Sequence, residues 1–117
     1  FQVIDDILDY TGDETTVGKP VGGDLRQGLI TLPMLYFMES NPDDPLVRNL
    51  VSGKVIDGEE EIQLLVHRTA TSDAISRAHD VAVDFARKAE ASLYDFRECP
   101  EREALFEITR YIIEREK

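Results

Sequence analysis

The stretch Phe1-Gln2-Val3-Ile4-Asp5-Asp6-Ile7-Leu8-Asp9-Tyr10 decides the fold. A helix turns by roughly 100° per residue, so on a helix the polar side chains of this stretch fall within one arc of about 100°. The apolar side chains fill the remaining arc of about 260°. A helix that is apolar over most of its surface requires burial. The polar stripe nevertheless consists of three carboxylates and one amide: Asp5, Asp6, Asp9 and Gln2.

These carboxylates predict a bound cation. Three acids in largely apolar surroundings would repel one another and lose hydration unless a positive charge lies against them. Asp5 and Asp9 are one turn apart, which places their Cβ atoms about 5–6 Å from each other. Hard oxygen ligands at this spacing suit Mg²⁺, which keeps several waters and takes further ligands from a substrate phosphate. A calcium loop of the EF-hand type fits poorly, because two apolar residues occupy the centre of the motif. The alternative is an acidic helix end or a solvated patch that binds nothing.

Further segments follow in an order that is typical of one enzyme family. They are Gly18-Lys19-Pro20, then Gly23-Asp24-Leu25-Arg26-Gln27-Gly28 and Thr31-Leu32-Pro33. With the first stretch they closely resemble the trans-type polyprenyl diphosphate synthases, in which the second aspartate-rich motif precedes a Gly-Lys and a Gly-x-Asp-Leu loop. Residues 110–117 are similar to the family's C-terminal helix. No other DDxxD motif occurs in the sequence. Residues 1–117 therefore resemble the C-terminal helical portion of such an enzyme, without its first aspartate-rich motif.

The resemblance implies a prenyltransferase of isoprenoid biosynthesis. Such an enzyme joins isopentenyl diphosphate head-to-tail to an allylic diphosphate, and Mg²⁺ stabilises the charge that develops on the departing diphosphate. Family members are usually homodimers, and we expect the same of the full-length protein. Because the family's site also uses helices that precede this portion, we expect the chain alone to be inactive. Residues 22–28 look more like the medium- and long-chain branch of the family than the farnesyl branch.

The resemblance also implies roles for the polar stripe. Asp5 is expected to ligate Mg²⁺ directly, and Asp6 and Asp9 are expected to ligate the metal or to order its waters. Gln2 lies on the same stripe and is expected to make a polar contact with the substrate diphosphate. Exclusion of water from the pocket, which a carbocation requires, would explain why acids lie on an otherwise apolar helix.

Two residues outside the first stretch belong to the expected site. Lys19 matches the family lysine that contacts the allylic diphosphate. It is the only base between Phe1 and Asp24, a segment with six acids, and an ammonium group complements a metal-bridged polyphosphate. Asp24 either orders metal-bound water or acts as an N-cap for the residues that follow it.

Two other functions remain open. A non-catalytic helical module for binding or regulation could retain the acidic helix. Another DDxxD enzyme, such as a terpenoid cyclase or a head-to-head synthase, is a further possibility, although Gly18-Lys19-Pro20 and residues 23–26 favour the elongating synthases. If the residues encoded upstream contain another aspartate-rich motif on a helix, the enzyme is favoured over the non-catalytic module.

Composition limits the partners. The formal net charge of −11 argues against direct binding of nucleic acid or of an anionic membrane. Cys99 is the only cysteine, so no intrachain disulfide can form, which is compatible with the cytoplasm. No run approaches the roughly 20 apolar residues that span a bilayer. The sequence lacks an initiator Met and opens within a predicted helix, so we expect it to be part of a longer protein, shortened by truncation or by proteolysis.

The remainder of the chain contains helical patterns and no strand pattern. Prolines mark the first turns of helices over 33–40 and 45–51, the second of them with Asp44 as N-cap. A capping-box-like start at residues 57–60 precedes an apolar face of Ile62, Leu65 and Val66. The last two helices are expected to begin at Thr71 or Ser72 and at Cys99-Pro100. The predicted fold class is all-α, an antiparallel helical bundle of the isoprenoid synthase type.

The last two helices carry broad apolar faces. The predicted face of the longer one consists of Ile75, Ala78, Ala82, Phe85, Ala86, Ala89, Leu93 and Phe96. His79 shares this face and is expected to be a satisfied core histidine. On the final helix, the predicted apolar set includes Leu105, Ile108 and Ile112. The small alanines should let neighbouring helices approach closely.

Overall fold

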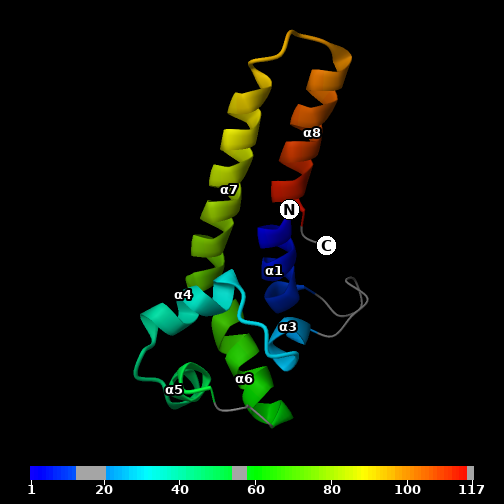
Figure 1. Ribbon diagram of the computed structural model, residues 1–117. Coiled ribbons are helices and arrows are strands. Elements are labelled where there is room, and N and C mark those ends of the chain that lie inside the picture. The colour runs from blue at the N-terminus through cyan, green and yellow to red at the C-terminus, as the bar shows by residue number, and fades with distance from the viewer. Residues whose placement is uncertain (13–20, 54–57, 116–117) are drawn as a thin grey trace.

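The computed structural model describes residues 1–12, 21–53 and 58–115, and within these ranges it is helical with no strand. Figure 1 shows the helices in chain order. They are α1 (Gln2–Thr11), α3 (Gly23–Arg26), α4 (Leu32–Ser40), α5 (Pro45–Val51), α6 (Glu59–Ala70), α7 (Ala74–Leu93) and α8 (Pro100–Glu114). The all-α prediction is confirmed.

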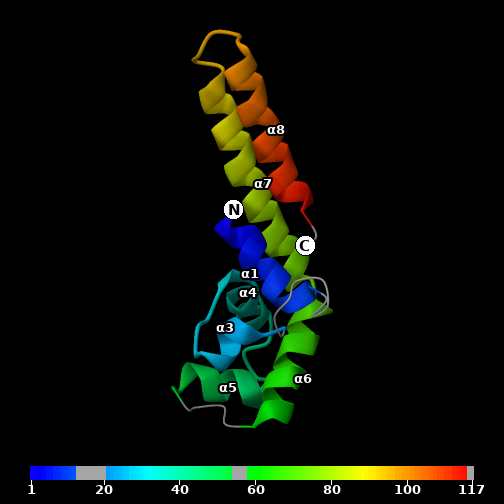
Figure 2. The ribbon, with the colours of Figure 1, turned by 90° about the vertical axis from the view of Figure 1, so that its right-hand side faces the viewer.

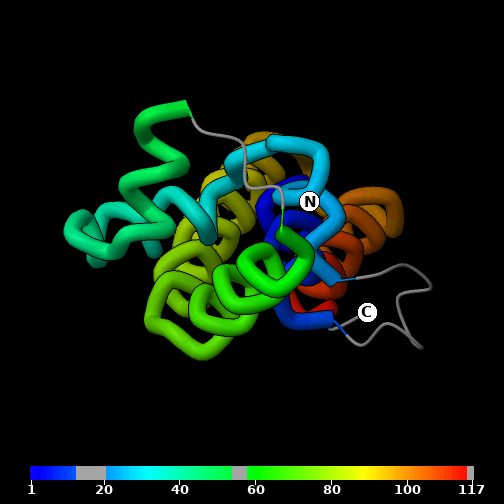
Figure 3. Tube along the Cα trace, turned by 90° about the horizontal axis from the view of Figure 1, so that it is seen from below, coloured from blue at the N-terminus to red at the C-terminus, as the bar shows by residue number. Residues whose placement is uncertain are grey.

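Two columns of helices organise the molecule. Helix α6 leads into α7 after a short break, and α8 returns antiparallel to α7. The C-terminal end of α8 lies beside the N-terminal end of α1, so that α1 follows α8 along the long axis of the molecule (Figures 1 and 2). Viewed along the columns, α1 lies inside the molecule, where it contacts α7, α4, α6 and α3 (Figure 3). The overall extents of 53 × 30 × 21 Å reflect the far half of the α7–α8 hairpin, which extends as a two-helix arm.

The apolar arc of α1 is buried at Ile4, Ile7 and Tyr10, whereas Val3 and Leu8 are half-buried and Phe1 is 67% exposed. Ile4 and Ile7 pack against Ala78 and Ala82 of α7, whose small side chains allow the two helices to approach closely. One turn further on, Tyr10 joins a second cluster built from α3, α4, α5, α6 and the start of α7. Burial of apolar surface on both sides fixes the orientation of α1, and the acidic stripe takes the side that is left.

Most helices begin near the capping residues and prolines from which their starts were predicted. The side chain of Asp44 accepts hydrogen bonds from the backbone N–H groups of Leu46 and Val47, at 2.9 and 3.4 Å. Pro33 and Pro45 lie in the first turns of α4 and α5. The N-cap of α6 is Gly58, and the predicted role of Asp57 lies outside the described residues. Ser72 Oγ accepts a hydrogen bond from the N–H of Ala74 at the start of α7, at 3.2 Å.

The broad apolar faces predicted for α7 and α8 are only partly buried. Phe85 and Phe96 are 60% and 65% exposed, and Leu105 and Ile108 are 48% and 54% exposed. In the arm each helix has a single neighbour, so each buries only the stripe that faces its partner, and Phe96 lies beyond the end of α7 at Leu93. Periodicity predicts an apolar face but not how many helices cover it, so it did not predict that these four side chains are exposed.

His79 is exposed rather than part of the core. Its Nε2 lies 3.1 Å from the carbonyl oxygen of Ile113, near the C-terminal end of α8. Carbonyl groups at a helix end lack partners within the helix, so a ring N–H is a suitable donor there. His79 thus links α7 to α8, and the prediction of a core histidine was wrong.

Within the described part of the chain, none of the helices combines the length and the apolar character needed to cross a bilayer.

Candidate functional site on the first helix

The three carboxylates of α1 lie on one side of the helix, and each has a different partner. Asp5 Oδ1 forms an ion pair with Arg115 Nη2. Asp6 Oδ1 accepts a hydrogen bond of 2.8 Å from Gln2 Nε2, one turn earlier on the same helix. Asp9 Oδ2 accepts a hydrogen bond of 3.0 Å from the backbone N–H of Asp24. The stripe therefore divides into partly exposed carboxylates at Asp5 and Asp6 and a buried one at Asp9, which is 3% exposed.

Asp9 fixes the turn that leads into α3. Its backbone oxygen accepts a hydrogen bond of 2.7 Å from the N–H of Gly22, in addition to the carboxylate bond to Asp24. Gly22 has φ +82°, and a Cβ atom placed there would lie 2.6 Å from Cγ2 of Val66. Both the left-handed backbone and the close approach of α6 therefore require glycine at this position. The result is a turn held against the end of α1.

The structure excludes one of the two roles predicted for Asp24, that of an N-cap. The N-cap of α3 is Gly22, and Asp24 lies inside the first turn of that helix. An N-cap carboxylate usually accepts a bond from an N–H two or three residues later. Here the acceptor for an N–H of the first turn comes from Asp9, fifteen residues earlier in the chain. The N-cap prediction for Asp24 was wrong, but the structure brings Asp24 into contact with the acidic stripe.

Arg115 is the site residue that the sequence did not reveal. Besides its ion pair with Asp5, its guanidinium carbon lies 4.5 Å from the centre of the Phe1 ring. The side chain is 16% exposed. Arg115 and Asp5 are 110 positions apart, so no local pattern connects them. They meet because α8 ends where α1 begins.

The hydroxyl of Tyr10 adds a neutral polar group beside the stripe. Tyr10 is 2% exposed. Burial raises the pKa of this hydroxyl well above its ordinary value, and the neighbouring Asp9 carboxylate adds to the rise. The phenol therefore stays protonated at physiological pH and adds no negative charge beside the acids.

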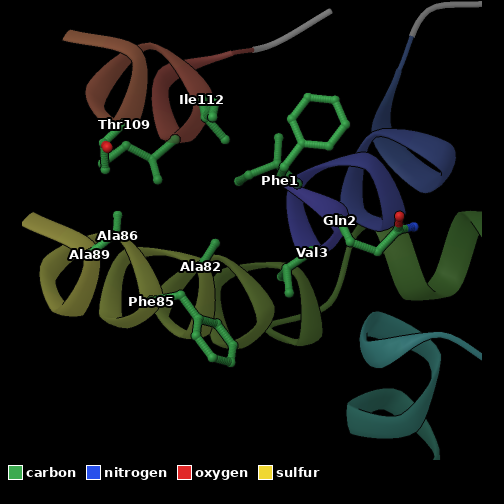
Figure 4. A pocket seen from close by; sticks show the side chains of 11 residues that line it. Phe1, Gln2, Val3, Ala82, Phe85, Ala86, Ala89, Thr109 and Ile112 are labelled. Carbon is green, nitrogen blue, oxygen red and sulfur yellow. The ribbon is translucent and has the colours of Figure 1, made fainter. Parts of the chain in front are cut away.

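An apolar cavity of about 500 Å³ lies at the N-terminal end of α1, between α1, α7 and α8. Figure 4 shows it between the α7 and α8 ribbons, with Phe1 and Ile112 near each other on one side and Ala82 on the α7 side. Its lining is apolar apart from Gln2 and Thr109. Helix α1 thus presents carboxylates on one face and borders a hydrocarbon-lined space with another.

The described residues contain no group of three or more His, Cys, Asp or Glu side chains that could hold a metal ion by itself. A metal at Asp5 and Asp6 would take further ligands from water or from a bound anion. This donor set fits Mg²⁺, which usually keeps several waters and binds through one or two carboxylates together with substrate phosphates. Lys19, the expected diphosphate contact, lies outside the described residues.

Comparison with known proteins gives one consistent result. The model of the family described as "Polyprenyl synthetase" matches residues 1–68. The chain is 36% identical over 115 residues to heptaprenyl diphosphate synthase component 2 of Bacillus subtilis (strain 168), an alignment that covers 96% of this chain and 31% of that protein. It is also 36% identical over 116 residues to nonaprenyl diphosphate synthase of Mycobacterium tuberculosis (strain ATCC 25618 / H37Rv), covering 98% of this chain and 34% of that protein. The chain thus spans about a third of the length of these curated relatives.

Solved structures agree in fold. Heptaprenyl diphosphate synthase from Staphylococcus aureus matches with a TM-score of 0.89 and 31% identity, over 99% of this chain and 36% of that one. The apo form of an Arabidopsis medium/long-chain length prenyl pyrophosphate synthase matches with a TM-score of 0.79 and 32% identity, over 99% of this chain and 40% of that one. The family model covers more than half of the sequence, and the resemblance predicted from the motifs is confirmed: the chain belongs to the polyprenyl synthetase family.

Proposed function

We propose that this chain is the C-terminal part of a prenyltransferase that condenses isopentenyl diphosphate with an allylic diphosphate in head-to-tail fashion. The observation that carries the proposal is the acidic stripe of α1, in which Asp5 and Asp6 stay partly exposed and none of the carboxylates belongs to the two buried apolar clusters. The family match over residues 1–68 includes the whole stripe, Lys19 and Asp24. The names of the relatives, heptaprenyl and nonaprenyl diphosphate synthases, support medium- to long-chain products.

The proposed site holds the diphosphate of the allylic substrate through Mg²⁺. Asp5 would ligate the metal directly, since its carboxylate is partly exposed and already attracts a cation. Asp6 would ligate the metal or order its waters, in the orientation that its bond from Gln2 favours. Asp9 would order metal-bound water through Oδ1, the carboxylate oxygen that does not accept the N–H of Asp24. Asp24 lies beside Asp9. Bound Mg²⁺ would neutralise negative charge as the diphosphate leaves.

The remaining contacts of the substrate follow the same reasoning. Lys19 would donate to the outer oxygens of the allylic diphosphate, which stay anionic after metal binding. Gln2 would add a neutral polar contact from the same face of α1. The apolar cavity beside Phe1 offers hydrocarbon surface close to the acids, which suits a substrate with a charged head and a prenyl tail. A cytoplasmic homodimer is part of this proposal, although the name "component 2" of one relative would fit an assembly with a second kind of subunit.

The experiment that tests the proposed function is a prenyl-transfer assay on the complete protein. Labelled isopentenyl diphosphate is incubated with geranyl or farnesyl diphosphate, with and without excess Mg²⁺. We expect extraction of a labelled polyprenyl product in the presence of Mg²⁺ and none after chelation by EDTA. The Asp5→Ala variant, purified in parallel, controls for contaminating host synthase. A protein that yields no product with either allylic substrate would support the non-catalytic module instead.

A further inference from the structure

The C-terminal end of α8 places a cation on Asp5, the carboxylate proposed above to bind Mg²⁺. Arg115 is the first residue after α8, and its N–H donates to the carbonyl of Ile112 at 3.4 Å. Its guanidinium lies over the ring of Phe1 and donates to Asp5 Oδ1. The negative end of the α8 dipole and the positive end of the α1 dipole meet at this point, so each charge lies at the helix end that favours it.

This ion pair differs from that of Arg110, which lies on α8. Arg110 is paired with Glu90 at 3.7 Å and is 63% exposed. Arg115 is much less exposed, yet its Nε is buried without a hydrogen-bond acceptor among the described residues. An unsatisfied buried donor costs free energy, so the buried position of Arg115 is only weakly favoured. Asp5, in contrast, is 41% exposed and accessible to a second cation.

We propose that Arg115 forms its ion pair with the Asp5 carboxylate only in the metal-free protein. When a divalent cation binds Asp5, the guanidinium leaves that carboxylate. The inference rests on the proposed function, because it takes Asp5 as a metal ligand. A metal in direct contact with Asp5 Oδ1 excludes the guanidinium from the same oxygen, since the two cations repel each other at that distance. Metal binding is thereby coupled to release of the last turn of α8, although α8 supplies no ligand.

The test compares Arg115→Gln with Arg110→Gln in the complete protein. Each variant removes one positive charge from the C-terminal part of the chain, but only the first removes the partner of Asp5. Calorimetric titration with Mg²⁺ in the presence of inorganic diphosphate should show about fivefold tighter metal binding for Arg115→Gln, the equivalent of one partly exposed ion pair. Arg110→Gln should bind Mg²⁺ as the wild type does. Equal affinities for all three proteins would overturn the proposal.

A second measurement tests whether the end of α8 is released when the metal binds, which a change in metal affinity alone does not show. In the wild-type protein, hydrogen exchange of the backbone amides of residues 112–115 should accelerate when Mg²⁺ and diphosphate are added. In Asp5→Asn, which cannot hold the metal in the same way, the same addition should leave the exchange unchanged. Slower or unchanged exchange in the wild type, with metal bound, would contradict release. If Asp5→Asn binds Mg²⁺ as tightly as the wild type, the proposed metal site itself is wrong, an outcome distinct from failure of the Arg115 role.

Discussion

Replacing Asp5 with Ala should lower the rate of prenyl transfer by roughly a hundredfold to a thousandfold, the usual cost of removing one group that stabilises developing negative charge. The carboxylate of Asp5 already pairs with a cation, the guanidinium of Arg115. Its loss should leave the fold intact, since its carboxylate is partly exposed and outside both buried clusters. The measurement is kcat for labelled isopentenyl diphosphate at saturating Mg²⁺.

The matched control for this prediction is Asp80→Ala, which removes an exposed aspartate from the neighbouring helix α7. It should leave kcat unchanged. Asp6→Ala should have an effect between the two, since Asp6 can ligate or merely order water. If Asp5→Ala keeps a rate within a few-fold of the wild type, Asp5 is not a metal ligand in the reaction.

Replacing Asp9 with Ala should affect stability more than any other change in the stripe. The buried carboxylate accepts the N–H of Asp24, and loss of a hydrogen bond to a charged group costs about 1.5–3 kcal/mol. The turn should keep the bond from Gly22 to the backbone oxygen of residue 9 but lose the bond that holds Asp24 against α1. The free energy of unfolding, measured by urea titration with far-ultraviolet circular dichroism, should fall by about that amount.

Two variants sharpen the Asp9 test. Asp9→Asn keeps an oxygen acceptor at the same position and should retain most of the stability. Asp43→Ala removes an exposed aspartate that pairs with Arg48 at 3.2 Å, and exposed pairs of this kind contribute less than about 1 kcal/mol. If Asp9→Ala is as stable as Asp43→Ala, the hydrogen bond to Asp24 does not hold the turn.

Helical periodicity was sufficient to predict α1 and the shared face of its acids. The phase of the apolar residues Ile4, Ile7 and Tyr10 determines which side of the helix is buried, and that side leaves the carboxylates together. Proline and aspartate signals near Asp44 likewise act within a few residues, so the start of α5 was predictable. Such features depend only on near neighbours in the chain.

The partners of the acids were not predictable in the same way. Asp9 turns toward Asp24 because a left-handed turn at Gly22 brings the chain back to α1. Asp5 meets Arg115 because the C-terminal end of α8 lies beside the N-terminal end of α1. Exposure of Phe85 and Ile108 depends on how many helices surround the arm. Each of these features is set by tertiary packing between segments far apart in the sequence, about which local periodicity carries no information.

The most direct test of the central claim is the position of the metal. A crystal of the complete protein, grown with Mn²⁺ and diphosphate and measured at a wavelength sensitive to manganese, would locate the ion by its anomalous signal. We predict a peak about 2 Å from a carboxylate oxygen of Asp5, with diphosphate oxygens and waters as its other ligands. A peak bound only to carboxylates outside α1, with Asp5 still paired to Arg115, would contradict the account.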